Sequence, residues 1–186
     1  MLTYILLGLV GLFVLLLVVI ALQPNSFRIE RQATIPAPAS EVFPHVADFR
    51  KWQAWSPWEN IDPNLQRTYS GASAGIGAVY DWSGDKCVGQ GRMTILESRP
   101  NEFIRIKLEF FKPFKGLNTT EFTFTPLGDR QTRVTWSMHG PKNFLAKALH
   151  MMCSMEKMIG GQYEKGLTSL QAIVTETRTA ASPATV

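Results

Sequence analysis

The hydrophobic positions of this chain begin with an unbroken apolar run. From Ile5 to Leu22 the sequence has no charged or strongly polar side chain, and about 20 such residues are what an α-helix needs to cross the hydrocarbon core of a bilayer. A secretory signal peptide would have a basic start and a shorter apolar stretch, whereas this chain starts MLTY, without Lys or Arg. We therefore predict a transmembrane anchor over residues 1–22. Cleavage after the V-x-A sequence at Val19–Ala21 is the alternative.

Behind this run the pattern predicts an antiparallel sheet. A first strand begins at Phe27 and ends before Pro36. Residues 66–139 then alternate between apolar and polar side chains, with the period of two that marks strands with one buried face. The inward positions are almost wholly apolar in residues 104–110, 122–124 and 134–138. Turn-forming residues separate the strands at 83–86, 99–102, 114–116 and 127–130.

Helices are predicted before and after this run of strands in the sequence. Ser40 and Asp48 are placed to cap two short helices. From Pro141 to Val174 apolar residues recur at spacings of three and four, as on one face of a helix. Gly160–Gly161 interrupts that pattern, and we expect a bend or a break there. The predicted organisation is an anchor at 1–22, a linker at 23–26, a folded domain at 27–176 and a disordered tail at 177–186.

Four segments in this order resemble a known superfamily. They are IPAPASEVFPHVADFRKWQAWSPW, the YSG…GIGAVYDW run, GRMTILESRPNEFIRIKLEF, and TRVTWSMHGP with the helix that follows, across residues 27–176. Together they resemble the SRPBCC superfamily, the helix-grip fold of START domains, Bet v 1-like proteins and polyketide cyclase/dehydrase-like lipid-transport proteins. The resemblance implies an α+β fold in which a curved antiparallel sheet of about seven strands (β-α-α-β6-α) grips the long C-terminal helix. It also implies a hydrophobic cavity between them. Members bind lipids, sterols and polyketides, and a minority catalyse cyclisation or related steps.

If that fold holds, a set of aromatic, methionine and isoleucine side chains is expected to line the cavity. Such walls are deformable and suit ligands of varied shape. For any one residue, filling an ordinary core is the competing interpretation. The expected ligand-binding residues are Trp58, Tyr80, Trp82, Met93, Ile95, Phe110, Phe124, Trp136, Met138, Met155 and Ile159.

The segment FRKWQAWSPWENIDPN contains three of the five tryptophans of the chain. Trp52 and Trp55 are three residues apart and share one face of a short helix. Pro57 must end that helix, so Trp58 points independently. We interpret Trp52 and Trp55 as wedges that lock the helices to the sheet edge, with contact to a ligand as the alternative, and we place Trp58 at the cavity wall.

Charge and chemistry narrow the function further. The net charge of +4 over 186 residues is spread without runs of one sign, which does not favour nucleic-acid binding. Cys87 and Cys153 show no metal-ligand spacing, and we expect two free thiols, no metal and no cofactor. The sequence shows no catalytic motif, and the polar residues nearest to a cavity would be Tyr80, Asp81, Asn118 and Thr120.

We therefore predict membrane-tethered binding or transfer of a hydrophobic small molecule or lipid. A polyketide cyclase-like enzyme acting in the same cavity is one alternative, and a non-catalytic interaction or regulatory domain is another.

The anchor also orients the domain. All Lys and Arg residues follow the apolar run, so the positive-inside rule favours a cytoplasmic domain. In a helix-grip fold the turns at 83–86, 112–116 and 139–142 lie at the end where the first strand begins, and a linker of about four residues spans at most roughly 14 Å.

That end of the sheet should therefore lie close to the bilayer. We expect a membrane rim at Phe111, Lys112, Phe114 and Lys115, a composition suited to an interface, and a cavity mouth that faces the membrane. An ordinary hairpin with Phe114 packed back is the alternative.

Overall fold

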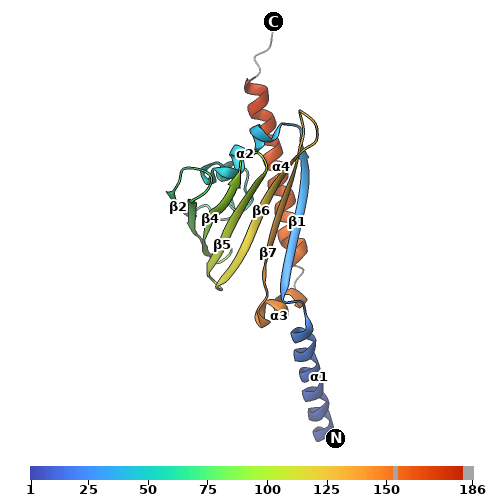
Figure 1. The fold of residues 1–186 in the computed structure, drawn as a ribbon. Helices are drawn as coiled ribbons and strands as arrows, with labels where there is room; N and C mark the ends of the chain where they lie inside the picture. Colours follow the sequence, from blue (N-terminus) through green and yellow to red (C-terminus); the bar gives the residue numbers. More distant parts are fainter. Residues whose placement is uncertain (153–154, 182–186) are drawn as a thin grey trace.

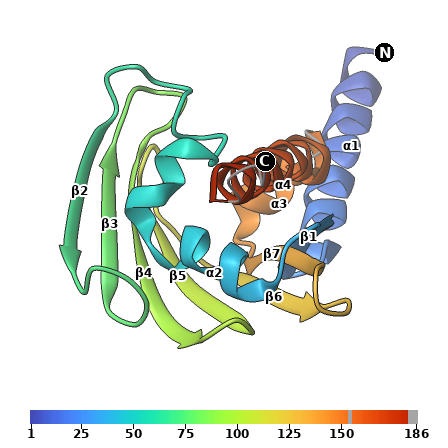
Figure 2. The same ribbon diagram turned by 90° about the horizontal axis from the view of Figure 1, so that it is seen from above.

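The computed structural model describes residues 1–152 and 155–181. Its centre is a curved seven-stranded antiparallel sheet, and a long helix and a short helical segment lie against its concave face (Figure 1, Figure 2). The predicted α+β helix-grip fold is thus confirmed. In chain order the elements are α1 (Leu2–Leu22), β1 (Ser26–Ile35), α2 (Ala39–Ala47), η1 (Phe49–Ala54), β2 (Gln66–Gly71), β3 (Ala78–Ser83), β4 (Gln90–Arg99), β5 (Phe103–Lys112), β6 (Gly116–Pro126), β7 (Thr132–Pro141), α3 (Phe144–Met152) and α4 (Met155–Ala181).

The strand order places the first and the last strand side by side. The sheet runs β1-β7-β6-β5-β4-β3-β2, and neighbouring strands pair antiparallel. Apolar side chains alternate onto the concave face, where Ile104, Phe122 and Val134 are fully buried. The alternation predicted along β5, β6 and β7 is therefore confirmed, because the buried face of each strand has the expected parity.

The long C-terminal helix is continuous where we expected a bend. α4 passes through Gly160–Gly161 without interruption, so that prediction was wrong; the helical region divides earlier, with α3 ending at Met152 and α4 starting at Met155. Gly160 instead makes room for Arg31 of β1, whose guanidinium occupies the space that a Cβ atom would need. The glycine serves close packing between helix and sheet.

Arg31 ties α4 to the first strand. Its guanidinium forms ion pairs with Glu156 at 2.7 Å and with Glu164 at 2.6 Å, and it donates to the carbonyl oxygen of Glu30 at 2.8 Å. Glu156 and Glu164 lie about two turns apart on the helix, on either side of Gly160. One arginine thus fixes two turns of α4 across β1.

The two short helices begin differently. α2 starts at Ala39 directly after Pro38, which is its N-cap and has φ −64° and ψ 154°. Ser40 therefore lies inside the first turn and does not cap the helix, contrary to our expectation, because the extended proline already sets the helix start. Asp48 does act as a cap, since its Oδ1 accepts a hydrogen bond from the backbone N–H of Arg50 at 2.9 Å. The helix that follows, η1, is a 3₁₀ helix.

The predicted domain boundaries shift at both ends. β1 begins at Ser26, inside the predicted linker of residues 23–26. α4 continues to Ala181, inside the segment 177–186 that we predicted as a tail. Residues 182–186 of that tail lie outside the described part of the chain.

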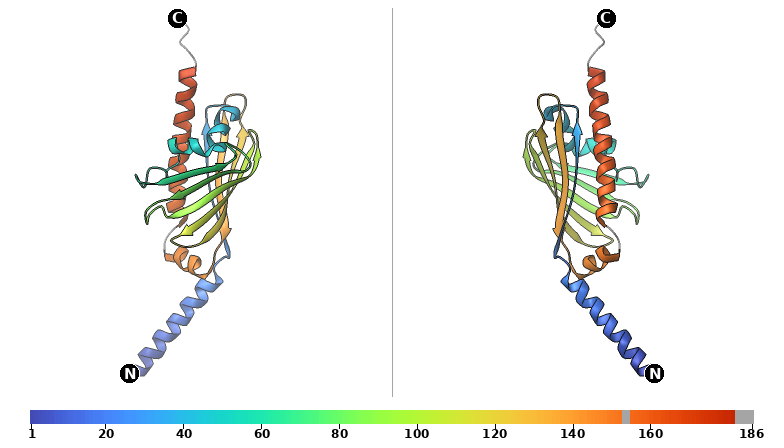
Figure 3. Two further views of the ribbon diagram at one scale, coloured as in Figure 1. Left: turned by 90° about the vertical axis from the view of Figure 1, so that its left-hand side faces the viewer. Right: turned by 90° about the vertical axis from the view of Figure 1, so that its right-hand side faces the viewer.

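α1 projects from one end of the sheet, and α3 lies beside its C-terminus (Figure 3). Residues Thr3–Leu22 are long and apolar enough to cross a membrane, with a mean hydropathy of 3.3. By length and composition a signal sequence near the N-terminus passes the same test. The predicted apolar helix is therefore confirmed.

The strand register divides the connecting segments between two ends of the sheet. We call the end where β1 begins the α1 end, and the opposite end the α2 end. The α1 end comprises residues 84–89, 112–116, 141–152 and 155–158, whereas the α2 end comprises residues 36–48, 72–77, 99–102 and 126–131.

Replacing either glycine of α4 tests the role of Arg31. Gly161→Ala should raise the unfolding free energy by up to about 1 kcal/mol through helix propensity, because nothing lies within 4 Å of the added Cβ. Gly160→Ala should instead lower the melting temperature of the full chain in detergent, since the new methyl group displaces the Arg31 guanidinium. In an Arg31→Ala background the two glycine variants should become equivalent. Equal effects of the two replacements in the wild-type background would contradict this account.

Candidate ligand-binding site

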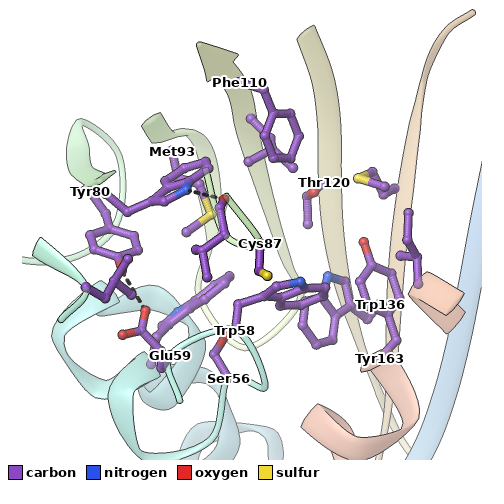
Figure 4. Close-up of a pocket in the computed structure, with 17 residues that line it drawn as sticks. Ser56, Trp58, Glu59, Tyr80, Cys87, Met93, Phe110, Thr120, Trp136 and Tyr163 are labelled. Carbon is purple, nitrogen blue, oxygen red and sulfur yellow. Dashed lines mark hydrogen bonds between the residues drawn. The ribbon is translucent and has the colours of Figure 1, made fainter. Parts of the chain in front are cut away.

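A cavity of about 210 Å³ lies between the sheet, the segment that follows η1, and α4 (Figure 4). Eight of the eleven predicted residues line it: Trp58, Tyr80, Trp82, Met93, Phe110, Trp136, Met138 and Ile159. The remaining wall is formed by Trp52, Ser56, Glu59, Leu65, Cys87, Val88, Leu108, Thr120 and Tyr163. Most of this lining is aromatic or aliphatic, as expected for a site that accepts a hydrophobic molecule.

Three predicted residues do not contribute to this wall. Ile95 and Phe124 have the expected inward parity but lie outside the cavity, at 1% and 3% exposure. Phe124 packs edge-on against Phe43 of α2, with ring centroids 5.3 Å apart. Both residues therefore fill solid core, which was the competing interpretation. The side chain of Met155 lies outside the described residues.

The cavity lies at the α1 end of the domain. Its wall includes Cys87 and Val88 of the turn between β3 and β4, Phe110 near the end of β5, and Ile159 near the start of α4. Towards the α2 end the same helix contributes Leu170, which is fully buried. The domain is thus solid at one end and hollow at the end from which α1 projects.

Trp52 and Trp55 pack the helical segment against the sheet, but against Phe122 of β6 and Trp136 of β7, which are inner strands, and not against the sheet edge that we predicted. Both are almost fully buried, and their indole N–H groups donate to the carbonyl oxygens of Val46 and His45, each at 3.0 Å. Because a buried N–H needs an acceptor, these bonds anchor the rings to the end of α2. Trp58, in contrast, is only partly buried and stands at the cavity wall.

Trp136 of β7 is the centre of the aromatic wall. Its ring stacks on Tyr163 of α4 with centroids 4.0 Å apart and on Phe122 at 4.8 Å, while Trp58 meets it edge-on at 5.7 Å. α4 can approach this closely because Gly166 has no side chain: a Cβ there would lie 2.8 Å from the indole ring. The buried Nε1 of Trp136 has no hydrogen-bond partner among the described residues.

The opposite wall contains a buried carboxylate that sequence reasoning missed. Glu59 is 5% exposed, yet both of its carboxylate oxygens are engaged. Oε1 accepts from the Tyr80 hydroxyl at 2.7 Å, and Oε2 accepts from Nε of Arg67 at 2.6 Å. Nη2 of Arg67 also donates to the Glu59 carbonyl oxygen at 2.8 Å. The site thus holds a compensated charge.

These contacts shift the ionisation of their partners. Burial, and then the hydrogen bond to Glu59, raise the pKa of Tyr80 far above its usual range. The hydrogen bond to Glu59 likewise raises the pKa of Arg67. At neutral pH this wall of the cavity therefore presents a neutral phenol and a closed ion pair, without an available base.

Asp62 supports the turn between β3 and β4, which contributes to the cavity wall. It is 6% exposed; its Oδ2 accepts from the backbone N–H of Asp85 at 2.7 Å, and its Oδ1 accepts from that of Asn64 at 2.8 Å. Asp85 lies in the turn between β3 and β4, which also carries Cys87. The carboxylate of Asp62 therefore connects residues 49–64, which we call the tryptophan segment, to that turn. In the sequence, Glu59 and Asp62 stand out only as acidic residues that directly follow the tryptophans, in WENID. Their partners lie on β2, on β3 and in turns, and the local pattern does not reveal them.

The polar residues that we expected near the cavity are distributed differently. Asp81 forms an ion pair with Arg92 at 2.7 Å and does not line the cavity. Asn118 also lies outside the lining, whereas Thr120 is buried within it. Burial raises the pKa of Tyr163 well above its usual range, and a side-chain hydrogen bond with Thr120 opposes part of that rise.

Metal chemistry finds no support in this part of the molecule. Within residues 1–152 and 155–181, no three or more His, Cys, Asp or Glu side chains are arranged to hold a metal ion. Cys87 is an exposed free thiol that lines the cavity, and Cys153 lies outside the described residues.

Comparison with known sequences agrees with this geometry. The model of the family described as polyketide cyclase/dehydrase and lipid transport matches residues 26–175. The chain belongs to this family. A search of curated proteins found no match.

Solved structures share the fold of this polyketide cyclase/dehydrase and lipid transport domain. The Zhui aromatase/cyclase from Streptomyces sp. R1128 is 15% identical, with a TM-score of 0.63 over 85% of this chain and 99% of that chain. A Staphylococcus aureus protein of unknown function is 7% identical, with a TM-score of 0.64 over 84% and 98%. The Aha1 dimer from Colwellia psychrerythraea is 14% identical, with a TM-score of 0.57 over 80% and 96%. At these identities the likeness shows the fold alone.

Removing the partner of the buried carboxylate should destabilise the domain strongly. Arg67→Ala leaves Glu59 buried with one charged hydrogen bond fewer, and we expect a loss on the order of 3 kcal/mol in urea unfolding. Arg92→Ala is the matched control, because its pair with Asp81 has 48% and 27% exposed side chains and should contribute little. Similar losses in the two variants would contradict the role that we assign to Glu59.

Alkaline pH should lower the stability of the fold because two tyrosines, Tyr80 and Tyr163, are buried. Their folded-state pKa values lie above the ordinary value of 10.0, so above pH 10 the unfolded chain loses protons that the folded chain retains, and stability falls as pH rises. Tyr163→Phe should flatten this decline in urea unfolding measured against pH, while changing stability at pH 7 by about 1 kcal/mol or less. An unchanged alkaline slope would show that Tyr163 ionises normally in the fold.

Proposed function

We propose that this domain binds a hydrophobic small molecule or lipid in the cavity between its sheet and α4, and that α1 tethers it to a membrane. The observation that carries the proposal is the hollow at the α1 end of an otherwise solid core, walled by Trp58, Met93, Met138 and Ile159. A folded domain packs its interior closely, so a cavity of about 210 Å³ is a departure that binding would explain.

The size of the cavity limits its occupant. Pockets for drug-sized ligands usually measure about 300–1,000 Å³, and this one is smaller at about 210 Å³. Met93 and Met138 on the sheet and Ile159 on α4 are side chains that can change rotamer and widen it. An acyl chain segment or a small lipophilic metabolite fits this description better than a rigid polycycle.

The position of the cavity favours exchange with the membrane. It lies in the half of the domain nearest to α1, and the predicted rim lies at the end of β5 and on the turn that follows, at the same end. Phe111 and Phe114 are 44% and 64% exposed. A hydrophobic ligand that passes directly between bilayer and cavity avoids water.

Catalysis on such a ligand is the alternative, and the cavity chemistry favours binding. Glu59, Tyr80 and Tyr163 line the cavity, and each is engaged by a neighbouring side chain. A general base or acid needs an atom free to reach the substrate. We therefore assign no catalytic residue and regard turnover of a bound molecule as a result that would replace the proposal.

Narrowing the cavity should weaken ligand binding without unfolding the domain. Ile159→Trp adds bulk at the α4 wall, and we expect at least tenfold weaker binding of the fluorescent probe N-phenyl-1-naphthylamine to the full chain in detergent. Ile95→Val is the control, because it removes a methylene from solid core, costs about 0.5–1.5 kcal/mol and should leave probe binding unchanged. If Ile159→Trp binds the probe as the wild type does, the cavity is not the binding site.

A further inference from the structure

Lysines collect at the α1 end of the domain. The connecting segments defined for this end contain six lysines and two acidic residues, Asp85 and Glu156. Asp62 lies beside Asp85 as well, but it is buried and its carboxylate is bonded to backbone N–H groups. At the α2 end the corresponding segments contain two arginines, Arg99 and Arg130, against four acidic residues. The sequence spreads these charges over separate segments, and only the fold brings them together. The lysines are Lys86, Lys112, Lys115, Lys142, Lys147 and Lys157.

Most of these lysines are available to a partner. Lys86, Lys112, Lys115 and Lys157 are exposed. Among the described residues, none of these four forms an ion pair. An unpaired group of like charges at one end attracts a surface of opposite charge and adds to the repulsion within the domain.

Lys147 has a different role, as the joint between α3 and α1. It is only 8% exposed, and its Nζ donates to the carbonyl oxygen of Ala21 at 2.9 Å. The last carbonyls of a helix have no partner within the helix, and a cation there also interacts favourably with the helix dipole. Nearby, the backbone N–H of Lys142 donates to the Asn25 carbonyl oxygen at 2.8 Å.

These bonds fix the height of α3 relative to the bilayer. α1 ends at Leu22, so if it spans a membrane, Ala21 lies at the boundary of the hydrocarbon and Lys147 lies at headgroup level. α3 carries exposed Phe144 and Met151, whose apolar side chains would reach lipid from this position. Exposed apolar residues beside lysines are the composition of an interfacial surface.

We propose that the α1 end of the domain, with α3 as an interfacial helix, docks onto anionic phospholipid headgroups. The hydrogen bond from Lys147 to Ala21 sets the orientation of the domain relative to α1. Lys86, Lys112, Lys115 and Lys157 attract the anionic headgroups. This inference rests on the part of the proposed function that places α1 in a membrane, and it extends the predicted rim to a second element and names the lipid charge. The cytoplasmic leaflet, which positive-inside orientation favours for this domain, carries such anionic lipids.

The test places reporters at three depths on the full chain. Single cysteines replace Met151 on α3, Leu117 beside the turn between β5 and β6, or Asp129 at the α2 end, in a Cys87→Ser, Cys153→Ser background. Each carries a fluorophore, and the chain is reconstituted into nanodiscs whose headgroups carry a quencher. One set is phosphatidylcholine, and the other also contains phosphatidylglycerol.

We expect the label at position 151 to be quenched in both lipids, that at 117 mainly in the anionic discs, and that at 129 in neither. High salt should release position 117, because screening weakens exposed charges. Lys112→Glu with Lys115→Glu should lower its docking equilibrium at least about tenfold. Arg99→Glu with Arg130→Glu, the same charge change at the α2 end, should not lower it.

Two results would overturn the proposal. One is quenching at position 117 that is the same in neutral and anionic discs, which would mean that headgroup charge does not matter. The other is quenching at position 151 no stronger than at 129, which would mean that α3 does not lie at the interface. Binding of N-phenyl-1-naphthylamine by unlabelled chain in the same discs reports separately on the cavity, so failure of docking and failure of ligand binding can be told apart.

Discussion

The stack of Trp136 between sheet and helix is the contact on which the rest of this structure depends. Tyr163 of α4 lies 4.0 Å from it, Phe122 of β6 lies 4.8 Å away, and Trp52, Trp55 and Trp58 meet it edge-on. Three parts of the chain, the sheet, α4 and the tryptophan segment, therefore join at one ring. Aromatic contacts of this kind add to the free energy of simple burial, and here they also set the floor of the cavity.

The cavity lies where the close packing between the sheet and α4 around Trp136 ends. Towards the α2 end, Leu167, Leu170 and Val174 continue the packing of α4 with almost no exposure. Across the strands from β6 towards β2, the sheet curves away from α4 (Figure 2). The tryptophan segment closes the space between them and is held there by Glu59 (Figure 4) and by Asp62. Buried carboxylates are expensive unless they are fully bonded, so their placement points to a wall that must hold its shape around an apolar space.

Local pattern was sufficient for the strands and for the parity of the wall, because alternation is a property of neighbouring residues. It could not tell how deep a residue lies along its strand, and so Ile95 and Phe124 were placed in the cavity with Met93 and Trp136. Gly160 suggested a bend for a similar reason: its role depends on Arg31, which lies far away in the chain. Glu59 was missed for the same reason, since only the fold reveals its partners. Of the lysines at the α1 end, the sequence predicted Lys112 and Lys115 as part of the membrane rim, whereas Lys86, Lys142, Lys147 and Lys157 lie in other segments that only the fold brings beside them.

The central claim is that the hollow at the α1 end holds a hydrophobic molecule, and native mass spectrometry of the full chain released from nanodiscs tests it most directly. The account predicts a bound species of about one lipophilic molecule per chain, present on purification or acquired after incubation with a membrane lipid extract. Unliganded chain as the sole species under both conditions, with the fold intact by circular dichroism, would contradict it.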